Sequence, residues 1–230
     1  MDAGLYIAAS GMLAQQVRQD QLANDLSNSS TPGYKSDSSV QSDFGSLLLS
    51  NTATGQQIGS LSTGVELGSP VTNLTPQTLY STNQPLDFGI AGEGFFAVRT
   101  SQGVRYTRDG QFQENSQGLL TDGQGDPVLS QNGATITVSA QGTVPASSLG
   151  VFNLTSVTKQ GSNLYTGTLG GRGTGTVKQG ELENSGVDPT TTMVNMISSL
   201  QTYQSGENAI QTIANTMQES ASTVGSLQGG

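Results

Sequence analysis

Residues 188–228 read DPTTTMVNMISSLQTYQSGENAIQTIANTMQESASTVGSLQ, and apolar residues recur there at one steady spacing for the length of a long helix. The spacing alternates between steps of four and three residues, which is typical of a coiled-coil seam. The members of the seam are Met196, Leu200, Tyr203, Ile210, Ala214, Met217, Ala221 and Val224. The charged residue Glu207 interrupts it once. Four more apolar residues widen the stripe: Met193, Val194, Ile197 and Ile213. We therefore expect this helix to pack against more than one neighbour.

Signals at both ends set the length of the helix. Asp188 suits the N-cap and Pro189 the first helical position, while Gly225 marks the end. About forty residues at about 1.5 Å each make a rod of roughly 60 Å, which is longer than a domain of this size needs. Gly206 costs about 1 kcal/mol relative to alanine inside a helix, so it either allows close packing or is simply tolerated. We assign residues 185–230 to the second half of an inner helical domain that other chains share.

Apolar residues near the N-terminus keep the same four-three steps. Leu5, Ala9, Met12, Ala23 and Leu26 lie on this line, Gln16 and Gln19 interrupt it, and Leu13 and Val17 lie beside it. The pattern predicts a second seam helix, and an ordinary amphipathic surface helix is the alternative. Residues 1–35 are therefore assigned to the first half of the inner helical domain, together with the turn that follows this helix. Two seam helices at opposite ends of one chain can pair and present a joint surface to other copies.

The segment between the helices has a different character. Residues 36–63 are rich in Ser, Thr, Gly and Gln and are predicted to form an extended linker, with the apolar patch at 44–49 as an anchor or short helix. In residues 64–184 the period changes to two, which predicts an antiparallel β domain. Its expected strands lie at 86–90, 94–99, 104–107, 111–114, 119–121, 127–130, 135–139 and 149–154, with returning strands near 164–166 and 177–180. The predicted fold class is α+β: long N- and C-terminal helices forming a coiled-coil layer, with an inserted antiparallel β domain.

The composition excludes most enzyme chemistry. The chain has no Cys and no His, which removes thiol nucleophiles, Cys/His zinc sites and imidazole general bases. The eight Lys and Arg are scattered and the net charge is −9, so no basic stripe is available to bind nucleic acid. We expect no catalytic residue, no cofactor and no metal. The N-terminus lacks the features of a cleavable secretion signal, and no apolar run is long enough to predict a membrane span.

Two acidic features each have a sharper and a plainer interpretation. The stretch from Asp122 to Asp126 resembles a calcium loop, but it lacks the ligands of an EF-hand, and a hairpin turn is the better prediction. Glu181 and Glu183 stand two residues apart on an expected strand, where an acid/base pair is conceivable. With no pocket evident, we expect both carboxylates to lie on a solvated face.

Three motifs near the two ends and the centre of the chain carry a family likeness. They are ANDLSN at 23–28 with TPGYK at 31–35, GEGFFAV at 92–98 with YTRDG at 106–110, and QGELENS at 179–185 leading to Tyr203 and Asn208. Together they resemble the signatures of the bacterial flagellar rod and hook proteins, above all the proximal and distal basal-body rod members. The motif positions are Asn24, Leu26, Asn28, Thr31, Gly33, Tyr34, Gly94, Phe95, Phe96, Tyr106, Thr107, Arg108, Gly110, Gly180 and Asn184.

The resemblance implies an architecture and a role. The paired terminal helices would form an inner coiled-coil layer, and subunits would stack helically into the hollow drive shaft that carries motor torque to the hook. Expected partners are copies of the chain, other flagellar rod and hook proteins, and the flagellar type III export apparatus, which would deliver the chain to the periplasmic rod without a cleavable signal peptide. Neither nucleic acid nor a direct membrane span is expected. The alternative is a secreted β-rich adhesin or phage-tail-like module that its terminal helices oligomerise.

Overall fold

The computed structural model describes residues 2–43, 46–50, 57–62, 64–161 and 163–227 of the chain. It divides into two compact units, which are described separately. The helical unit comprises Met1–Leu26, Asp37–Val71 and Pro189–Gly230, and the β unit comprises Ser27–Ser36 and Thr72–Asp188. Two helices and antiparallel sheets confirm the predicted α+β class.

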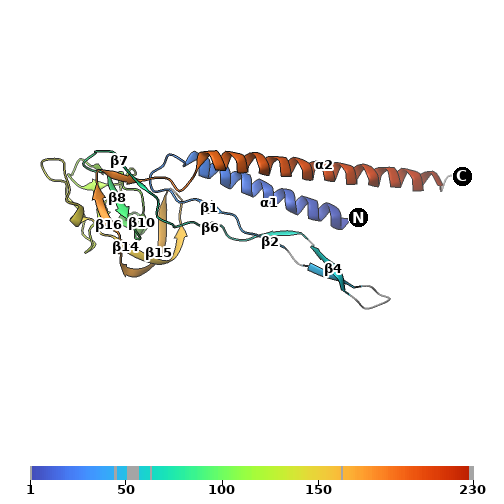
Figure 1. Ribbon diagram of the computed structural model, residues 1–230, viewed down its shortest axis with the longest axis horizontal. Helices are drawn as coiled ribbons and strands as arrows, with labels where there is room; N and C mark the ends of the chain where they lie inside the picture. The colour runs from blue at the N-terminus through green and yellow to red at the C-terminus, as the bar shows by residue number, and fades with distance from the viewer. Residues whose placement is uncertain (1, 44–45, 51–56, 63, 162, 228–230) are drawn as a thin grey trace. The chain divides into compact units, whose positions relative to one another are not determined.

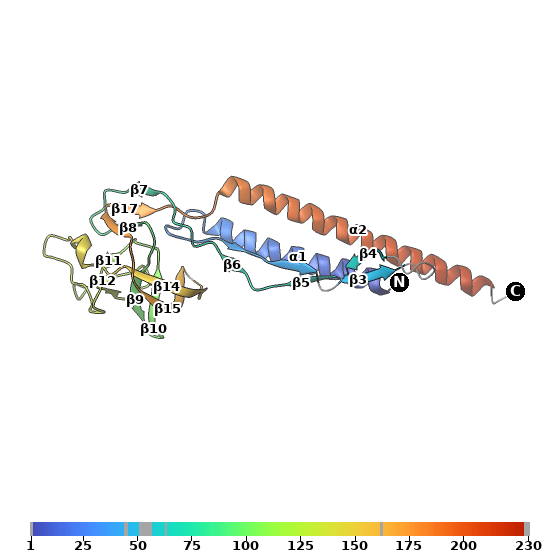
Figure 2. The ribbon, with the colours of Figure 1, turned by 60° about the horizontal axis from the view of Figure 1, so that its bottom comes forward.

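The two predicted helices are present in the helical unit. They are α1 (Asp2–Ser27) and α2 (Pro189–Leu227), which lie side by side (Figures 1 and 2). Gly4 faces Ile213 and Met12 faces Gly206, so the helices run antiparallel. The structure therefore favours close packing as the reason for a glycine inside α2, because a Cβ at position 206 would lie 2.9 Å from Met12 Cγ.

Short strands complete the helical unit. β2 (Gln41–Asp43) pairs with β5 (Val65–Leu67), β3 (Ser46–Ser50) pairs with β4 (Gln57–Ser62), and β1 (Asp37–Ser38) pairs with β6 (Val71–Thr72). The start of β5 lies against α1, where the Val65 amide donates to Ser10 Oγ at 3.4 Å.

Of the two expectations for 44–49, an anchor or a short helix, the short helix was wrong for its described residues. Ser46–Ser50 form strand β3, in which Leu47 pairs with Leu61 of β4. A helix of so few residues leaves most of its backbone groups unpaired, whereas a hairpin pairs them across the two strands. Phe44 and Gly45 lie outside the described residues.

The β unit is built on a five-stranded antiparallel sheet. Its order is β13 (Val128–Leu129), β9 (Phe96–Thr100), β10 (Gly103–Thr107), β15 (Leu164–Arg172) and β14 (Phe152–Lys159). Three two-stranded pairs accompany it: β7 (Leu79–Ser81) with β17 (Glu181–Glu183), β8 (Phe88–Ala91) with β16 (Thr176–Gln179), and β11 (Gln113–Glu114) with β12 (Leu120–Thr121). One 3-10 turn, η1, spans Ala146–Ser148.

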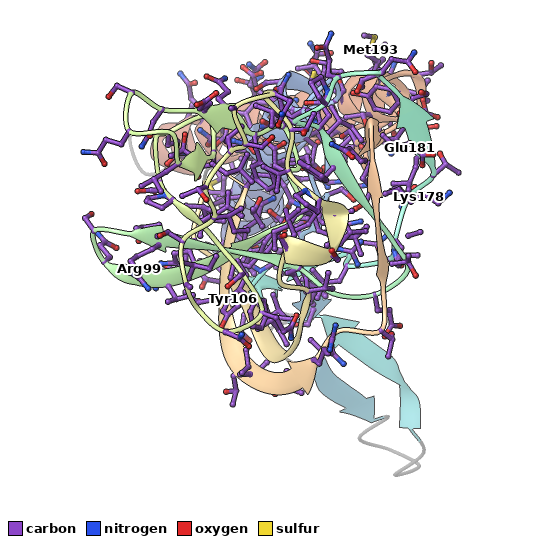
Figure 3. The ribbon with its side chains drawn as sticks, turned by 90° about the vertical axis from the view of Figure 1, so that its left-hand side faces the viewer. Arg99, Tyr106, Lys178, Glu181 and Met193 are labelled. Carbon is purple, nitrogen blue, oxygen red and sulfur yellow. The ribbon has the colours of Figure 1, made fainter. Side chains whose placement is uncertain are left out.

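Phenylalanines and branched aliphatic residues form the core of this unit. Phe96 packs edge-on against Phe112 with ring centroids 5.3 Å apart, and Val98, Leu120 and Val128 are fully buried around them. Burial does not alternate along these strands: Phe96, Ala97 and Val98 of β9 are all buried, and β10 changes from exposed at Gly103 to buried at Thr107. Figure 3 labels Arg99 and Tyr106, which lie on these two strands.

Two expected strands differ in the structure. Residues 135–139 form only isolated bridges, such as Leu119 to Thr137, because turns at Gly133 and Gly142 interrupt the pairing on both sides. The strand expected at 149–154 begins at Phe152, since η1 precedes it. The hairpin turn predicted at 122–126 is confirmed: Asp122 Oδ1 accepts hydrogen bonds from the amides of Gln124 and Asp126 at 2.9 and 2.8 Å.

Candidate functional site

Three sequence motifs that are far apart in the chain meet at a buried ionic cluster in the β unit. Glu183 Oε1 lies 2.7 Å from Lys35 Nζ, and Glu183 Oε2 lies 3.1 Å from Arg108 Nη1. The three side chains are almost completely inaccessible to solvent, at 0%, 0% and 2% for Lys35, Glu183 and Arg108. A buried ion pair of this kind is stable only if its remaining polar atoms are also hydrogen-bonded.

Backbone groups supply three further hydrogen bonds, although Arg108 Nε is buried without a hydrogen-bond partner among the described residues. Lys35 Nζ donates to the Thr75 carbonyl at 2.7 Å, the Gln77 amide donates to Glu183 Oε1 at 2.7 Å, and Arg108 Nη2 donates to the Gly92 carbonyl at 2.9 Å. Burial lowers the pKa of Lys35 from its ordinary value, while the hydrogen bond and charge of Glu183 oppose that shift. The carboxylate thus joins side chains and backbone from separate parts of the chain.

Gly33 lets two of these segments approach closely. Its φ is +65°, and an added Cβ would overlap the backbone carbonyl of Arg108. Its amide donates to the Glu183 carbonyl at 2.9 Å. Only glycine adopts this backbone conformation without strain and leaves room for the neighbouring chain.

Hydrogen bonds extend the cluster into a band of three crossing segments. The Ser185 hydroxyl donates to the Asn28 carbonyl at 3.0 Å, and the Gly186 amide donates to the Tyr34 carbonyl at 2.8 Å. The Asn73 amide donates to the Ser36 carbonyl at 2.9 Å. We call this band the collar: residues 28–36, 73–78 and 183–186, together with Arg108.

The end of the β14–β15 hairpin holds the first segment of the collar from another side. Lys159 Nζ lies 4.0 Å from the centroid of the Tyr34 ring and donates to the Lys35 carbonyl at 2.8 Å. Asn163 Nδ2 donates to the Pro32 carbonyl at 3.0 Å. The turn after α1 is therefore fixed by contacts from the end of β14, the β14–β15 turn, β17 and the end of β10.

The collar corrects the prediction for Glu183. The sequence predicted a solvated face for both acidic residues of this strand, but Glu183 is buried with two cations. Glu181 instead lies 3.6 Å from Lys178, in a pair exposed to solvent (Figure 3). The only warning in the sequence was that Lys35, Arg108 and Glu183 each stand inside a motif of a chain that is just 11% charged.

The structure places the other motif residues around this cluster and the core. Phe95 and Phe96 are buried, Thr107 Oγ1 accepts from the Asp109 amide at 3.0 Å, and Asn184 Nδ2 donates to Thr78 Oγ1 at 2.9 Å. The remaining motif residues take turn, packing or surface positions: Asn24 exposed, Leu26 and Tyr106 partly buried, Thr31 in the turn closed on Asn28, and Gly94, Gly110 and Gly180 at close backbone approaches or positive φ.

The face of α2 towards α1 differs by one residue from the predicted seam at every second position. Its buried and partly buried line is Thr192, Met196, Ser199, Tyr203, Gly206, Ile210, Ile213 and Met217. Ser199 Oγ donates to Gln15 Oε1 of α1 at 2.9 Å. Leu200 and Ala214, which were predicted on the line, are exposed. The small residues Ser199 and Gly206 take the inner face because they allow α1 to approach. The side chain of Val224 lies outside the described residues.

The predicted line on α1 also divides between two faces. Leu5, Met12 and Leu26 are partly buried, whereas Ala9, Leu13 and Ala23 are exposed. Ala14, which sequence periodicity did not single out, is the buried alanine of this helix, at 1% exposure.

Large apolar side chains lie exposed on both helices. The α1 stripe consists of Tyr6, Leu13 and Val17, and the α2 stripe consists of Met193, Val194, Ile197 and Leu200. Within the α2 stripe, Ile197 is 57% exposed and Leu200 is 44% exposed. Contiguous apolar patches of this kind mark surfaces that bind other molecules. Figure 3 labels Met193, at the beginning of α2.

Other kinds of site find no support in the described part of the chain. Among its residues no group of three or more acidic side chains could hold a metal ion. None of its helices is both long enough and apolar enough to cross a membrane.

Comparison with known families matches each of the three motif regions. Residues 5–35 match the family described as flagella basal body rod protein, residues 89–162 match the flagellar hook protein FlgE/F/G D1 domain, and residues 178–223 match the flagellar basal body rod FlgEFG protein C-terminal family. Each matched range contributes one member of the ionic cluster, namely Lys35, Arg108 and Glu183 in that order.

Individual relatives match along almost their whole length. The chain is 31% identical to the flagellar basal-body rod protein FlgG of Bacillus subtilis, with 94% of the chain and 96% of that protein covered. It is 29% identical to FlgG of Buchnera aphidicola subsp. Schizaphis graminum, with 94% and 97% covered. It is 27% identical to the flagellar basal-body rod protein FlgF of Caulobacter vibrioides, with 99% and 100% covered.

Proposed function

Because the chain belongs to the flagellar basal-body rod protein family, we propose that it polymerises helically with copies of itself and with other rod and hook proteins into a hollow drive shaft. The chain is a structural protein of the flagellar basal body and not an enzyme. In the proposed role, the shaft transmits motor torque to the hook and later subunits are exported through it.

The exposed apolar stripes on α1 and α2 carry this proposal. Burying apolar surface contributes about 25 cal/mol per Å² removed from water, so side chains such as Ile197 and Leu13 favour a partner. The two stripes differ in sequence and lie on different helices. We propose that the α2 stripe of one copy packs on the α1 stripe of the next, which is a heterologous contact. Contacts of that type repeat without closing when the rotation does not complete a ring, and they generate helical filaments.

The coiled-coil layer and the route of delivery belong to the same proposal. The antiparallel pairing of α1 and α2 supports a helical layer made from many copies. Family membership is the support for export by the flagellar type III apparatus and for a rod in the periplasm. The family match does not favour the alternative of an adhesin or phage-tail-like module.

A pair of leucine variants tests the proposal. Leu200→Asp places a charge in the α2 stripe, while Leu169→Asp places one on an equally exposed leucine of β15, at 53% exposure. Electron microscopy of the purified protein at high concentration should show open filaments of varied length for the parent protein and for Leu169→Asp, and none for Leu200→Asp.

The same variants can be tested in cells. A strain that lacks this protein should be non-motile and should build neither hook nor filament, and Leu169→Asp but not Leu200→Asp should restore both. Closed oligomers of one size in the purified protein, or normal swimming of the deletion strain without a second copy of the gene, would refute the proposed function.

A further inference from the structure

We propose that the collar is a latch, closed by Glu183, that holds together the two points at which the chain leaves the β unit for α1 and for α2. Glu183 is then a positioning residue for helix pairing and assembly. The inference rests on the proposed function, because it explains how a monomer presents its two helices to other copies.

The collar lies where the chain passes from the β unit into each of the two helices. Helix α1 ends at Ser27, directly before Asn28, and α2 begins at Pro189, a few residues after Ser185. The Ser185 hydroxyl donates to the Asn28 carbonyl at 3.0 Å, across a sequence separation of 157 residues. The collar therefore brings both exits within one hydrogen bond of each other.

One carboxylate accepts a hydrogen bond from each of the other parts of the collar. Glu183 accepts hydrogen bonds from Lys35 Nζ of the first segment, from the Gln77 amide of the second, and from Arg108 Nη1 at the end of β10. A glutamine at position 183 has one acceptor oxygen in place of two and no charge. It would leave two buried cations without a counter-charge and would weaken the bonds from Lys35, Gln77 and Arg108 at the same time.

Large apolar side chains supply only part of the contact between the two helices. Thr192, Ser199 and Gly206 interrupt the larger residues on the face of α2 towards α1, and these three bury little apolar surface. Two weakly attracting elements associate far more readily when a short tether gives them a high effective concentration. With the collar closed the tether is a few residues at each exit. With the collar open, the two helices are separated by the whole β unit and its linkers.

The latch residues lie outside the central hydrophobic core of the β unit. The hydrophobic core of the β unit, around Phe96, Val98 and Phe112, does not include Lys35, Glu183 or Arg108. Strand pairing between β9 and β10 involves five residue pairs and none of the collar segments. Loss of the latch should therefore open the collar while the central sheet remains paired.

The test compares two substitutions on the same strand in the full chain. Glu183→Gln removes the buried charge, and Glu181→Gln removes the exposed charge that faces Lys178. Amide hydrogen exchange should become at least tenfold faster at Gly33, Gln77 and Gly186 in Glu183→Gln, with unchanged protection on β9 and β10. Glu181→Gln should match the parent protein throughout. Unchanged exchange at the three collar amides in Glu183→Gln would overturn the latch.

Polymerisation of the purified variants gives the functional readout. Glu183→Gln should form at least tenfold fewer filaments than the parent protein at equal concentration, and Glu181→Gln should form the same number. An engineered disulfide, Asn28→Cys with Ser185→Cys, is available because the chain has no other Cys. After oxidation is verified by mass, this bond should restore filaments to Glu183→Gln, and reduction should remove them.

Each outcome of this experiment decides something. An open collar with normal filament formation overturns the role of the latch in assembly, as does a verified disulfide that restores nothing. If mass shows that the disulfide does not form, hydrogen exchange at Gly33, Gln77 and Gly186 decides whether Glu183 closes the collar. Failure of the parent protein to polymerise counts against the proposed function alone. The latch is tested separately, by the rate of hydrogen exchange at the collar amides.

Discussion

Replacement of Gly33 by alanine tests how closely the collar segments approach. The backbone of Gly33 is left-handed, with φ of +65°, and a Cβ there would overlap the carbonyl oxygen of Arg108. Two separate costs follow from this geometry. Left-handed backbone costs alanine about 1 to 2 kcal/mol, and forcing an extra carbon into packed structure typically costs about 1 to 3 kcal/mol more.

Gly142 offers a matched control for the first of these costs. Its φ is +70°, and a Cβ added there meets no atom within 4 Å. Gly142→Ala should therefore lose about 1 to 2 kcal/mol, from backbone strain alone. Gly33→Ala should lose about 2 to 5 kcal/mol, which is a large part of the 5 to 15 kcal/mol of stability that is about normal for a folded domain.

Urea unfolding of the full chain, followed by circular dichroism in the β-sheet region, measures both variants. The loss of unfolding free energy should be larger for Gly33→Ala than for Gly142→Ala, by at least about 1 kcal/mol. Equal losses in the two variants would show that the Arg108 carbonyl moves away freely. The collar would then be a loosely packed region, and the argument from close approach would be refuted.

Two further predictions concern the helix pair and the dependence of stability on pH. Gly206→Ala should stabilise the chain less than Gly11→Ala. Both variants gain about 1 kcal/mol of helix propensity, but a Cβ at position 206 would lie 2.9 Å from Met12, whereas nothing lies within 4 Å of a Cβ at position 11. Thermal unfolding compares the two variants, and equal gains in stability would contradict close packing. The pKa of Asp109 is raised from 3.8 to about 6. Burial is the main cause, the hydrogen bond from the Gln111 amide opposes it, and the nearby acidic side chains add a smaller increase. The stability that this shift contributes is fully present below pH 3.8 and is lost as the pH rises through about 6. Asp109→Asn should therefore be more stable than the parent protein at pH 8, by about 1 to 3 kcal/mol, and should show no such advantage at pH 3.5. Urea unfolding at the two pH values measures the difference.

The sequence predicted those features whose causes are local. Pro189 does begin α2, because proline suits the first helical position whatever the rest of the chain does. The turn at 122–126 follows from an aspartate that accepts bonds from its own neighbouring amides, within a few residues. Most of the expected strands were found, but residues 135–139, where apolar and polar residues alternate beside glycine turns, form isolated bridges.

The ionic cluster could not be predicted in the same way, because its partners are distant in sequence. Lys35 is separated from Glu183 by 148 residues, and Arg108 is separated from it by 75. Alternation on a strand says only which side chains share a face. It does not say which face is covered, and here the chain that covers Glu183 comes from the turn after α1. The charge pattern made a solvated face the reasonable expectation, and the fold reversed it.

The one-residue displacement of the helix seam has a different cause. The prediction kept strict four-three steps from Met196, which placed Leu200 and Ala214 on the line, whereas the structure has Ser199 and Ile213 there. Near the middle of the pair, Ser199 and Gly206 let α1 approach where a larger side chain would hold it away. Regular spacing of apolar residues therefore does not identify the inner face where two helices within one chain pack closely.

The distribution of side-chain size around α2 bears on the proposed function. A chain selected only for a stable monomer would turn Ile197 and Leu200 towards α1, since burying either contributes about 1.5 to 3 kcal/mol. The structure instead places Thr192, Ser199 and Gly206 among the larger apolar residues of the inner face and leaves the α2 stripe exposed to water. That arrangement is costly unless another surface covers the stripe. In the proposed assembly, the seven apolar side chains of the α1 and α2 stripes, which lie exposed in the isolated helix pair, become the contacts between copies. The order of the helices and the growth of the filament then depend on the same residues.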